Sequence, residues 1–129
     1  MLFTIPEPNI EPLVKAIAQA TKYVYYAKNW AGDDSIPPTQ DTVSTAIEIM
    51  RAMAMCWPIP QLSLSADGEI GLAWYNQCNR VEILCIRKEF LYIGKFDSMY
   101  EEGEDLPFIK HDIPPRLALM MDRLYGGPQ

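Results

Sequence analysis

The stretch that decides the fold is residues 60–96, PQLSLSADGEIGLAWYNQCNRVEILCIRKEFLYIGKF. It contains four short runs in which side chains alternate with a period of two, as in strands with two different faces. Turn-forming residues separate the runs: Asp67-Gly68, the polar run 76–79 and the charged run 87–89. Because glycine tolerates a positive φ, Asp67-Gly68 predicts a two-residue hairpin. Residues 60–96 therefore predict a four-stranded antiparallel β-meander.

Helical patterns stand on both sides of this meander. Apolar residues at three- and four-residue spacing predict helices over residues 9–28, 39–57 and 113–125. Pro58 ends the second helix, and Gly126-Gly127 ends the third. The order α-α-β-β-β-β-α predicts one α+β domain spanning residues 1–129, with the helices packed on one face of the sheet.

The other face of the sheet is expected to remain open to solvent. Alternation along the strands assigns it Tyr75, Arg80, Glu82 and Tyr92. A sheet face rich in aromatic side chains is a candidate binding surface.

The composition is typical of a globular domain rather than a membrane protein. Of 129 residues, 49% are hydrophobic and 22% are charged, and no apolar run approaches the roughly 20 residues of a membrane span. The N-terminus has neither the basic region nor the apolar run of a signal peptide. Three cysteines without a C-x-x-C pair do not form a disulfide framework. We therefore expect a cytoplasmic protein with no membrane association.

Negative charge is concentrated in one segment. Five carboxylates and no cation occur between residues 97 and 105, so this segment contributes −5 of the net charge of −6. The carboxylates are Asp97, Glu101, Glu102, Glu104 and Asp105. A nucleic-acid surface needs clustered Lys and Arg instead, so direct nucleic-acid binding is not expected. The pattern predicts an acidic loop over residues 97–111 that contacts a basic surface on a protein partner.

Candidate catalytic and metal-binding residues are few. His111, the one histidine, has no nucleophile or acid nearby in the sequence, and no hydrolase, phosphate-loop or dinucleotide motif occurs. Asp33-Asp34 and the acidic run do not have the spacing of a calcium loop. Cys78 lies in a predicted turn near Arg80, whereas the other two cysteines, at positions 56 and 85, are expected to be buried. We expect no enzyme activity, no cofactor and no metal.

An aromatic cluster ends the first predicted helix. It comprises Tyr23, Tyr25, Tyr26 and Trp30. If exposed, these side chains would form a contact surface for a protein or a planar ligand, because Tyr and Trp combine large rigid area with a polar group. If buried, they would form the corner where this helix passes over the sheet. We expect Trp30 to be buried and at least one tyrosine to be exposed.

Residues 29–96 resemble a pattern found in small bacterial and phage-associated proteins of no established function. The shared features are a Trp-x-Gly turn at 30–32, the pair Pro37-Pro38 before a helix, the exit 57–60, and an Asp-Gly hairpin leading to Trp74. These motifs are structural: a helix start, a helix stop and a turn. The resemblance implies an α+β layout and a bacterial or phage origin.

The chain departs from this pattern at three positions. Ala66 stands where the pattern has Pro, Trp57 where it has Leu, and Ala73 where it has Glu. The resemblance therefore supplies no catalytic residue.

Two functions from different classes are compatible with these features. The first is a non-enzymatic acidic protein that inhibits or neutralises a larger partner, as antitoxins, immunity proteins and phage anti-defence or anti-CRISPR inhibitors do. The second is a ligand-binding module or small enzyme with a cleft lined by the residue 23–30 aromatics. The absence of catalytic motifs favours the first. The oligomeric state is not indicated by the sequence.

Overall fold

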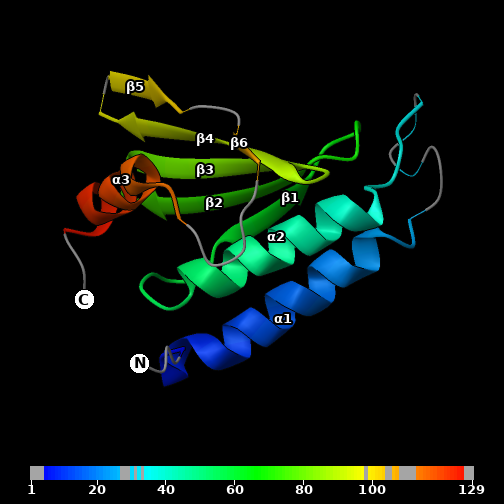
Figure 1. The fold of residues 1–129 in the computed structure, drawn as a ribbon, viewed down its shortest axis with the longest axis horizontal. Helices are drawn as coiled ribbons and strands as arrows, with labels where there is room; N and C mark the ends of the chain where they lie inside the picture. The colour runs from blue at the N-terminus through cyan, green and yellow to red at the C-terminus, as the bar shows by residue number, and fades with distance from the viewer. Residues whose placement is uncertain are drawn as a thin grey trace.

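The computed structural model describes residues 5–26, 30, 32, 34–97, 99–103, 106–107 and 113–126, with the backbone alone at 99–102 and 106–107. The helices are α1 (Glu7–Tyr23), α2 (Gln40–Met53) and α3 (Pro115–Tyr125). The strands are β1 (Gln61–Leu64), β2 (Ile70–Asn76), β3 (Asn79–Ile86), β4 (Glu89–Phe96), β5 (Met99–Glu102) and β6 (Leu106–Pro107). Figure 1 shows α1 and α2 side by side next to β1, and α3 near one end of β2, β3 and β4.

The sheet is an antiparallel meander, which confirms the predicted α+β class and the element order through its first four strands. Each strand from β1 to β5 pairs with the next along the chain, and the short β6 pairs with β4. Two-residue turns join β2 to β3 and β3 to β4, so the register is fixed by local geometry.

The β1–β2 connection differs from the predicted two-residue hairpin. Ser65 N–H donates to the Glu69 carbonyl at 2.9 Å, and Gly68 N–H donates to the Ser65 carbonyl at 3.0 Å, so the loop has three residues. Gly68 has a φ of +79°, and a Cβ there would lie 2.9 Å from the Pro37 carbonyl oxygen. Glycine is required for both reasons, because the connector before α2 packs directly on this turn.

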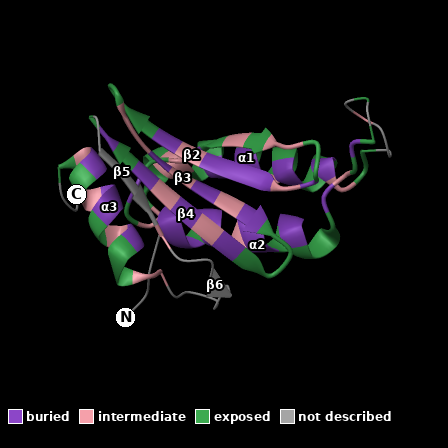
Figure 2. Ribbon diagram, turned by 90° about the horizontal axis from the view of Figure 1, so that it is seen from above, coloured by how far each residue is buried: buried purple, intermediate pink, exposed green. Residues whose placement is uncertain are grey.

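One face of the sheet forms the core with all three helices. Register places Leu72, Ile83 and Tyr92 side by side across β2, β3 and β4, and all three are buried. Helix α1 packs on α2 and β1, α2 on β2 and β3, and α3 on β2, β3 and β4. Figure 2 shows buried and exposed residues alternating along α2 and α3, as expected of helices that cover a sheet.

Tyr92 was assigned to the open face, and that prediction is wrong. Its neighbour in the register is Ile83, which faces the helices, and Tyr92 is only 3% exposed. Both faces of β4 carry large apolar residues, so alternation within β4 alone did not distinguish them.

The helices are shorter than predicted at the ends that enter turns. The first helix was predicted over 9–28, but α1 ends at Tyr23, where Tyr25 and Tyr26 make hydrogen bonds to the carbonyls three residues earlier. Helix α2, predicted over 39–57, ends at Met53 before the turn that leads to Pro58. Helix α3 begins at Pro115 rather than 113.

The segment 97–111, predicted as a loop, contains strands β5 and β6. Backbone pairing with β4 extends the sheet at this edge, with Lys95 opposite Tyr100 and Phe96 opposite Met99. Hydrogen bonding to β4 therefore overcomes the weak strand propensity of the glutamates.

Two long-range hydrogen-bonding side chains fix the layers relative to each other. Asn9 Nδ2 donates to the carbonyls of Ala54 and Trp57, both at 2.9 Å, and so ties the start of α1 to the turn after α2. Trp74 Nε1 donates to the Pro58 carbonyl at 2.7 Å. Among the described residues, no helix is long and apolar enough to cross a membrane.

Candidate protein-binding surface

The acidic residues predicted as a contact site are spread over a turn and a strand. Asp97 is exposed in the β4–β5 turn, where its backbone N–H donates to Asn79 Oδ1 at 2.8 Å. Glu101 and Glu102 belong to β5, paired with Gly94 and Ile93. Glu104 and Asp105 lie outside the described residues. Strand β5 therefore holds two of the five acidic positions at the edge of the sheet.

The aromatic cluster at the end of α1 is largely packed on itself. Tyr23 is buried and contacts Tyr26 edge to face, and Tyr26 contacts Trp30, with ring centroids 5.5 Å apart in both pairs. Trp30 Nε1 donates to the Ile36 carbonyl at 2.8 Å. Trp30 is half-buried rather than buried, and Tyr25 is 83% exposed. The cluster therefore forms mainly the corner between α1 and the connector to α2, with Tyr25 free to make contacts.

The sheet face opposite the helices is not covered by them. None of the described helices packs on it, because every helix contacts the face that carries Leu72 and Ile83. Its apolar residues are half-buried: Ala73, Leu84, Leu91 and Ile93. We call this surface the open face; its polar and charged members are Gln61, Ser63, Tyr75, Arg80, Glu82 and Lys95.

Register organises the open face into rows across the strands. Leu84 lies opposite Leu91, and Ile93 follows Leu91 on the same face of β4, so these three residues form an apolar strip that Glu82, opposite Ile93, borders. Tyr75, Arg80 and Lys95 form a neighbouring row. The predicted exposure of Tyr75 is confirmed, while Arg80 and Glu82 lie half-buried on this face and are joined by an ion pair of 3.4 Å.

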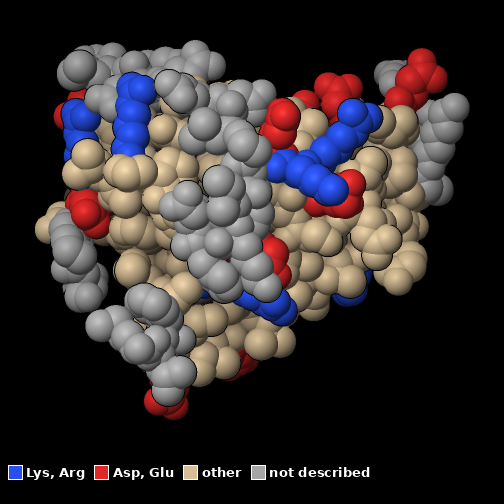
Figure 3. All heavy atoms as spheres, viewed as in Figure 1, with Lys and Arg blue, Asp and Glu red and all other residues tan. Residues whose placement is uncertain are grey.

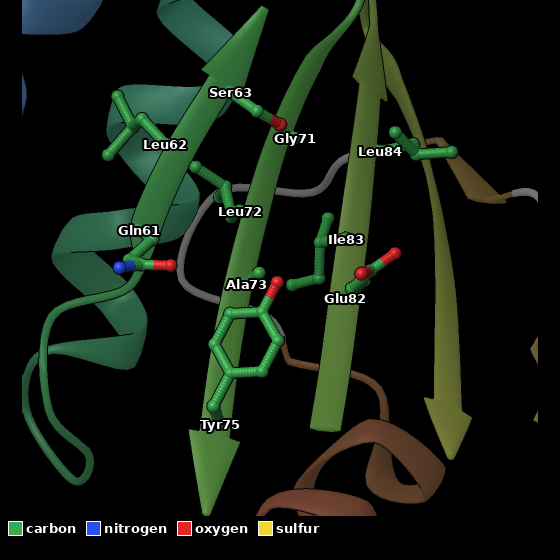
Figure 4. A pocket seen from close by; sticks show the side chains of 10 residues that line it. All are labelled: Gln61, Leu62, Ser63, Gly71, Leu72, Ala73, Tyr75, Glu82, Ile83 and Leu84. Carbon is green, nitrogen blue, oxygen red and sulfur yellow. The ribbon is translucent and has the colours of Figure 1, made fainter. Parts of the chain in front are cut away.

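A shallow hollow of about 120 Å³ marks the open face between β1 and β3. It exists because Gly71 and Ala73 have small side chains, while Ser63, Tyr75 and Glu82 stand around them (Figure 4). Figure 4 shows the Tyr75 ring running back along β2 toward Ala73. Cavities that bury a drug-sized ligand are about 300–1,000 Å³, so this hollow suits one protruding side chain of a partner better than a cofactor.

The β3–β4 turn is held rigidly by two buried threonines of α2. Thr42 Oγ1 accepts the Arg87 N–H at 2.7 Å, and Thr45 Oγ1 donates to the Arg87 carbonyl at 2.6 Å. Arg87 has a φ of +54°, which is uncommon for a residue other than glycine. Nothing in the sequence pattern of α2 indicated this contact, because its partners lie 42 and 45 positions away.

Charges near this turn are mixed. Asp41 and Glu89 line the same surface depression as Arg87 and Lys88. Figure 3 shows Lys and Arg atoms beside Asp and Glu atoms where this turn lies. On the face in that view, the described residues form no extended stripe of one sign.

The remaining predicted site residues assemble no catalytic or metal centre within the described part of the chain. His111 and Asp33 lie outside it, and Asp34 is exposed with a φ of +62°. No group of three His, Cys, Asp or Glu side chains among the described residues is placed to hold a metal ion.

The cysteines differ from one another in environment. Cys56 is exposed, so the prediction that it is buried is wrong: α2 has ended three residues earlier, and the chain has turned outward. Cys85 is buried as predicted, and desolvation raises the pKa of its thiol to about 12. Cys78 is exposed, with Sγ 3.7 Å from Asp97 Oδ1.

Comparison of the chain with protein-family models, curated proteins and solved structures found no match, so the resemblance to small bacterial and phage-associated proteins stays a prediction.

Proposed function

We propose that this protein is a non-enzymatic binding domain that inhibits or neutralises a larger protein, as antitoxins, immunity proteins and phage anti-defence inhibitors do. The observation that carries the proposal is the open face, a half-exposed apolar strip bordered by charged and aromatic side chains. The acidic residues between 97 and 105 are proposed to supply the contact with a basic surface.

The composition of the open face suits contact with protein. Leu84, Leu91 and Ile93 lose further solvent exposure only if something covers them, and each Å² of apolar area removed from water contributes about 25 cal/mol. Tyr75 and Arg80 are residue types enriched where interfaces derive most of their affinity. A broad sheet face with only a small hollow complements another protein surface more readily than a small ligand.

The position of β5 couples the acidic segment to this face. Glu102 pairs with Ile93, an apolar member of the open face, so the acidic strand borders the apolar strip in the register. A partner seated on the strip would therefore lie next to this negative charge. Electrostatic attraction of this kind accelerates association and weakens with added salt.

The alternative, a small enzyme or ligand-binding module, has less support. The aromatic corner is packed on itself, the hollow on the open face is small, and the larger hollow of about 590 Å³ between α1 and β1 is a wide groove open to solvent rather than an enclosed cavity. Tyr25 is the one member of the aromatic cluster with most of its side chain in solvent.

The experiment is affinity capture from a bacterial lysate with three forms of the full chain: the unchanged protein, Leu91→Lys and Leu119→Lys. Leu91 lies on the open face, whereas Leu119 is 68% exposed on α3, in the helical layer. We expect one stoichiometric protein to be retained by the unchanged chain and by Leu119→Lys and lost with Leu91→Lys. Equal retention by all three forms would exclude the open face as the binding surface.

The electrostatic part is tested separately. Neutralising Glu101, Glu102, Glu104 and Asp105 together is expected to slow association and to remove most of its salt dependence. If the captured protein binds this variant with unchanged rate and salt dependence, the acidic segment is not part of the contact.

A further inference from the structure

The outer strand β1 has an edge whose main-chain groups point away from the sheet. Strand β1 pairs with β2 alone. The hydrogen bond from the Ser65 N–H to the Glu69 carbonyl shows that the main-chain groups of Ser65 point toward the β2 side. Hydrogen-bonded and non-hydrogen-bonded positions alternate along antiparallel strands. The N–H and C=O groups of Gln61 and Ser63 therefore point toward β2, like those of Ser65. The N–H and C=O groups of Leu62 and Leu64 therefore point outward.

Along this edge, the main-chain groups that could bond to a further strand are limited to the middle of β1. Beyond Leu64, the next outward carbonyl, that of Ala66, accepts the Ile36 N–H at 2.8 Å. At the other end, Pro60 has no N–H to offer. Between them, no described residue makes a hydrogen bond to the outward groups of Leu62 and Leu64. The available length matches about two to four residues of an added strand.

A hollow of about 590 Å³ lies beside this edge, between β1 and α1. Its walls come from α1 and from the chain entering β1, and no β2 residue lines it, so it lies on the outward side of the strand. The α1 wall carries Ala16 at its base and Lys15 and Gln19 at its rim. A helix set beside an open strand edge leaves room for an extended chain and for its side chains.

We propose that this groove receives an extended segment of a partner protein, which adds to the sheet as a strand beside β1. Its main chain would bond to Leu62 and Leu64, and an apolar side chain would enter the hollow against Ala16 and Leu62. Main-chain pairing with a strand edge is specific to an extended backbone, which identifies the occupant as polypeptide. The groove adjoins the open face along β1, where Gln61 borders both, but the inference does not depend on the function proposed for the open face.

The first part of the test is hydrogen exchange of the full chain in solution, followed by NMR. In the free protein, the Leu62 and Leu64 amides are expected to exchange at least tenfold faster than the Ser63 amide, because only Ser63 is bonded to β2. Equal protection of all three in dilute protein would overturn the proposal. Protection that appears only as protein concentration rises would identify a second copy of the chain as the occupant, and would also overturn it.

The second part uses a displayed library of random 12-residue peptides, selected on the full chain. We expect selected peptides to protect the Leu62 and Leu64 amides and to lose at least tenfold in affinity with Leu62→Pro, which removes one outward donor. Gln19→Trp, which fills the hollow from an exposed position, provides a second test should Leu62→Pro destabilise β1. Val14→Trp is its matched control, because Val14 is exposed on α1 but does not line the hollow.

Two results would overturn the proposal. One is a library that yields no peptide with a Kd below about 1 mM. The other is a set of peptides that bind Gln19→Trp and Val14→Trp equally well. Peptides lost with Leu91→Lys but not with Gln19→Trp would assign binding to the open face, which keeps the two surfaces distinguishable.

Discussion

Removal of the Thr42 hydroxyl by Thr42→Val is expected to destabilise the fold through the β3–β4 turn. Thr42 Oγ1 accepts the Arg87 N–H at 2.7 Å and lies 3.0 Å from Thr39 Oγ1. Valine has nearly the same shape and a similar helix propensity, so the change removes the hydroxyl and its hydrogen bonds to Arg87 and Thr39 while leaving the packing nearly unchanged. The Arg87 N–H would be left without a partner in a partly buried place. We expect a loss of about 1–2 kcal/mol in the free energy of unfolding.

Thr45→Val removes the second bond to the same residue. Its hydroxyl donates to the Arg87 carbonyl at 2.6 Å, and we expect a loss of about 0.5–1.5 kcal/mol. Because both threonines hold one turn, the double variant should cost less than the two single variants added together. Urea denaturation followed by circular dichroism measures all three values.

Thr21→Val is the matched control. The Thr21 hydroxyl is exposed and donates to the Ile17 carbonyl of its own helix at 2.7 Å, so its removal should change stability by less than about 0.5 kcal/mol. If Thr42→Val and Thr45→Val are as stable as this control, the two threonines do not hold the turn and the reasoning is refuted.

Three further predictions concern tight packing and thiol chemistry. Gly103→Ala should cost about 1–3 kcal/mol, because a Cβ there would collide with the buried ring of Tyr92; unchanged thermal stability would contradict this contact. In the folded protein, a thiol reagent should modify Cys56 and Cys78 rapidly and Cys85 only after unfolding, which a count of released chromophore measures. Burial raises the pKa of Cys85 to about 12 from 9.0, so above pH 9 the unfolded thiol ionises while the folded one stays neutral. The free energy of unfolding should therefore fall as the pH rises from 9 to 12, by up to about 1.4 kcal/mol per pH unit. This fall should be smaller in Cys85→Ala. An equal dependence of the unfolding free energy on pH in the two proteins would argue against the burial of Cys85.

The meander could be predicted from the sequence because its signals are local. Alternation, two-residue turns and Gly68 act within a few residues of each other, and the register follows from them. The same register could have corrected the assignment of Tyr92, since a two-residue turn at Arg87 and Lys88 places it opposite Ile83. Alternation within β4 alone does not distinguish its two faces, because both carry large apolar residues.

The features that the sequence did not indicate depend on contacts between distant segments. Asn9 bonds through its side chain to carbonyls 45 and 48 positions away, which no local pattern indicates. The open face could be predicted in outline, but its boundary at β5 could not. Glutamates are poor strand formers, and Glu101 and Glu102 are in a strand here because their main chain pairs with β4.

The chain-order pairing of the sheet has a consequence for how the protein folds. Strands β2, β3 and β4 close through two-residue turns, so each pairing costs little loop entropy. The docking of α1 instead joins residues separated by about 45 positions. A folding nucleus made of these three strands should precede the docking of α1. Cys85→Ala should then slow refolding, whereas Leu13→Ala on α1 should mainly speed unfolding, and stopped-flow kinetics showing the reverse would place α1 in the nucleus.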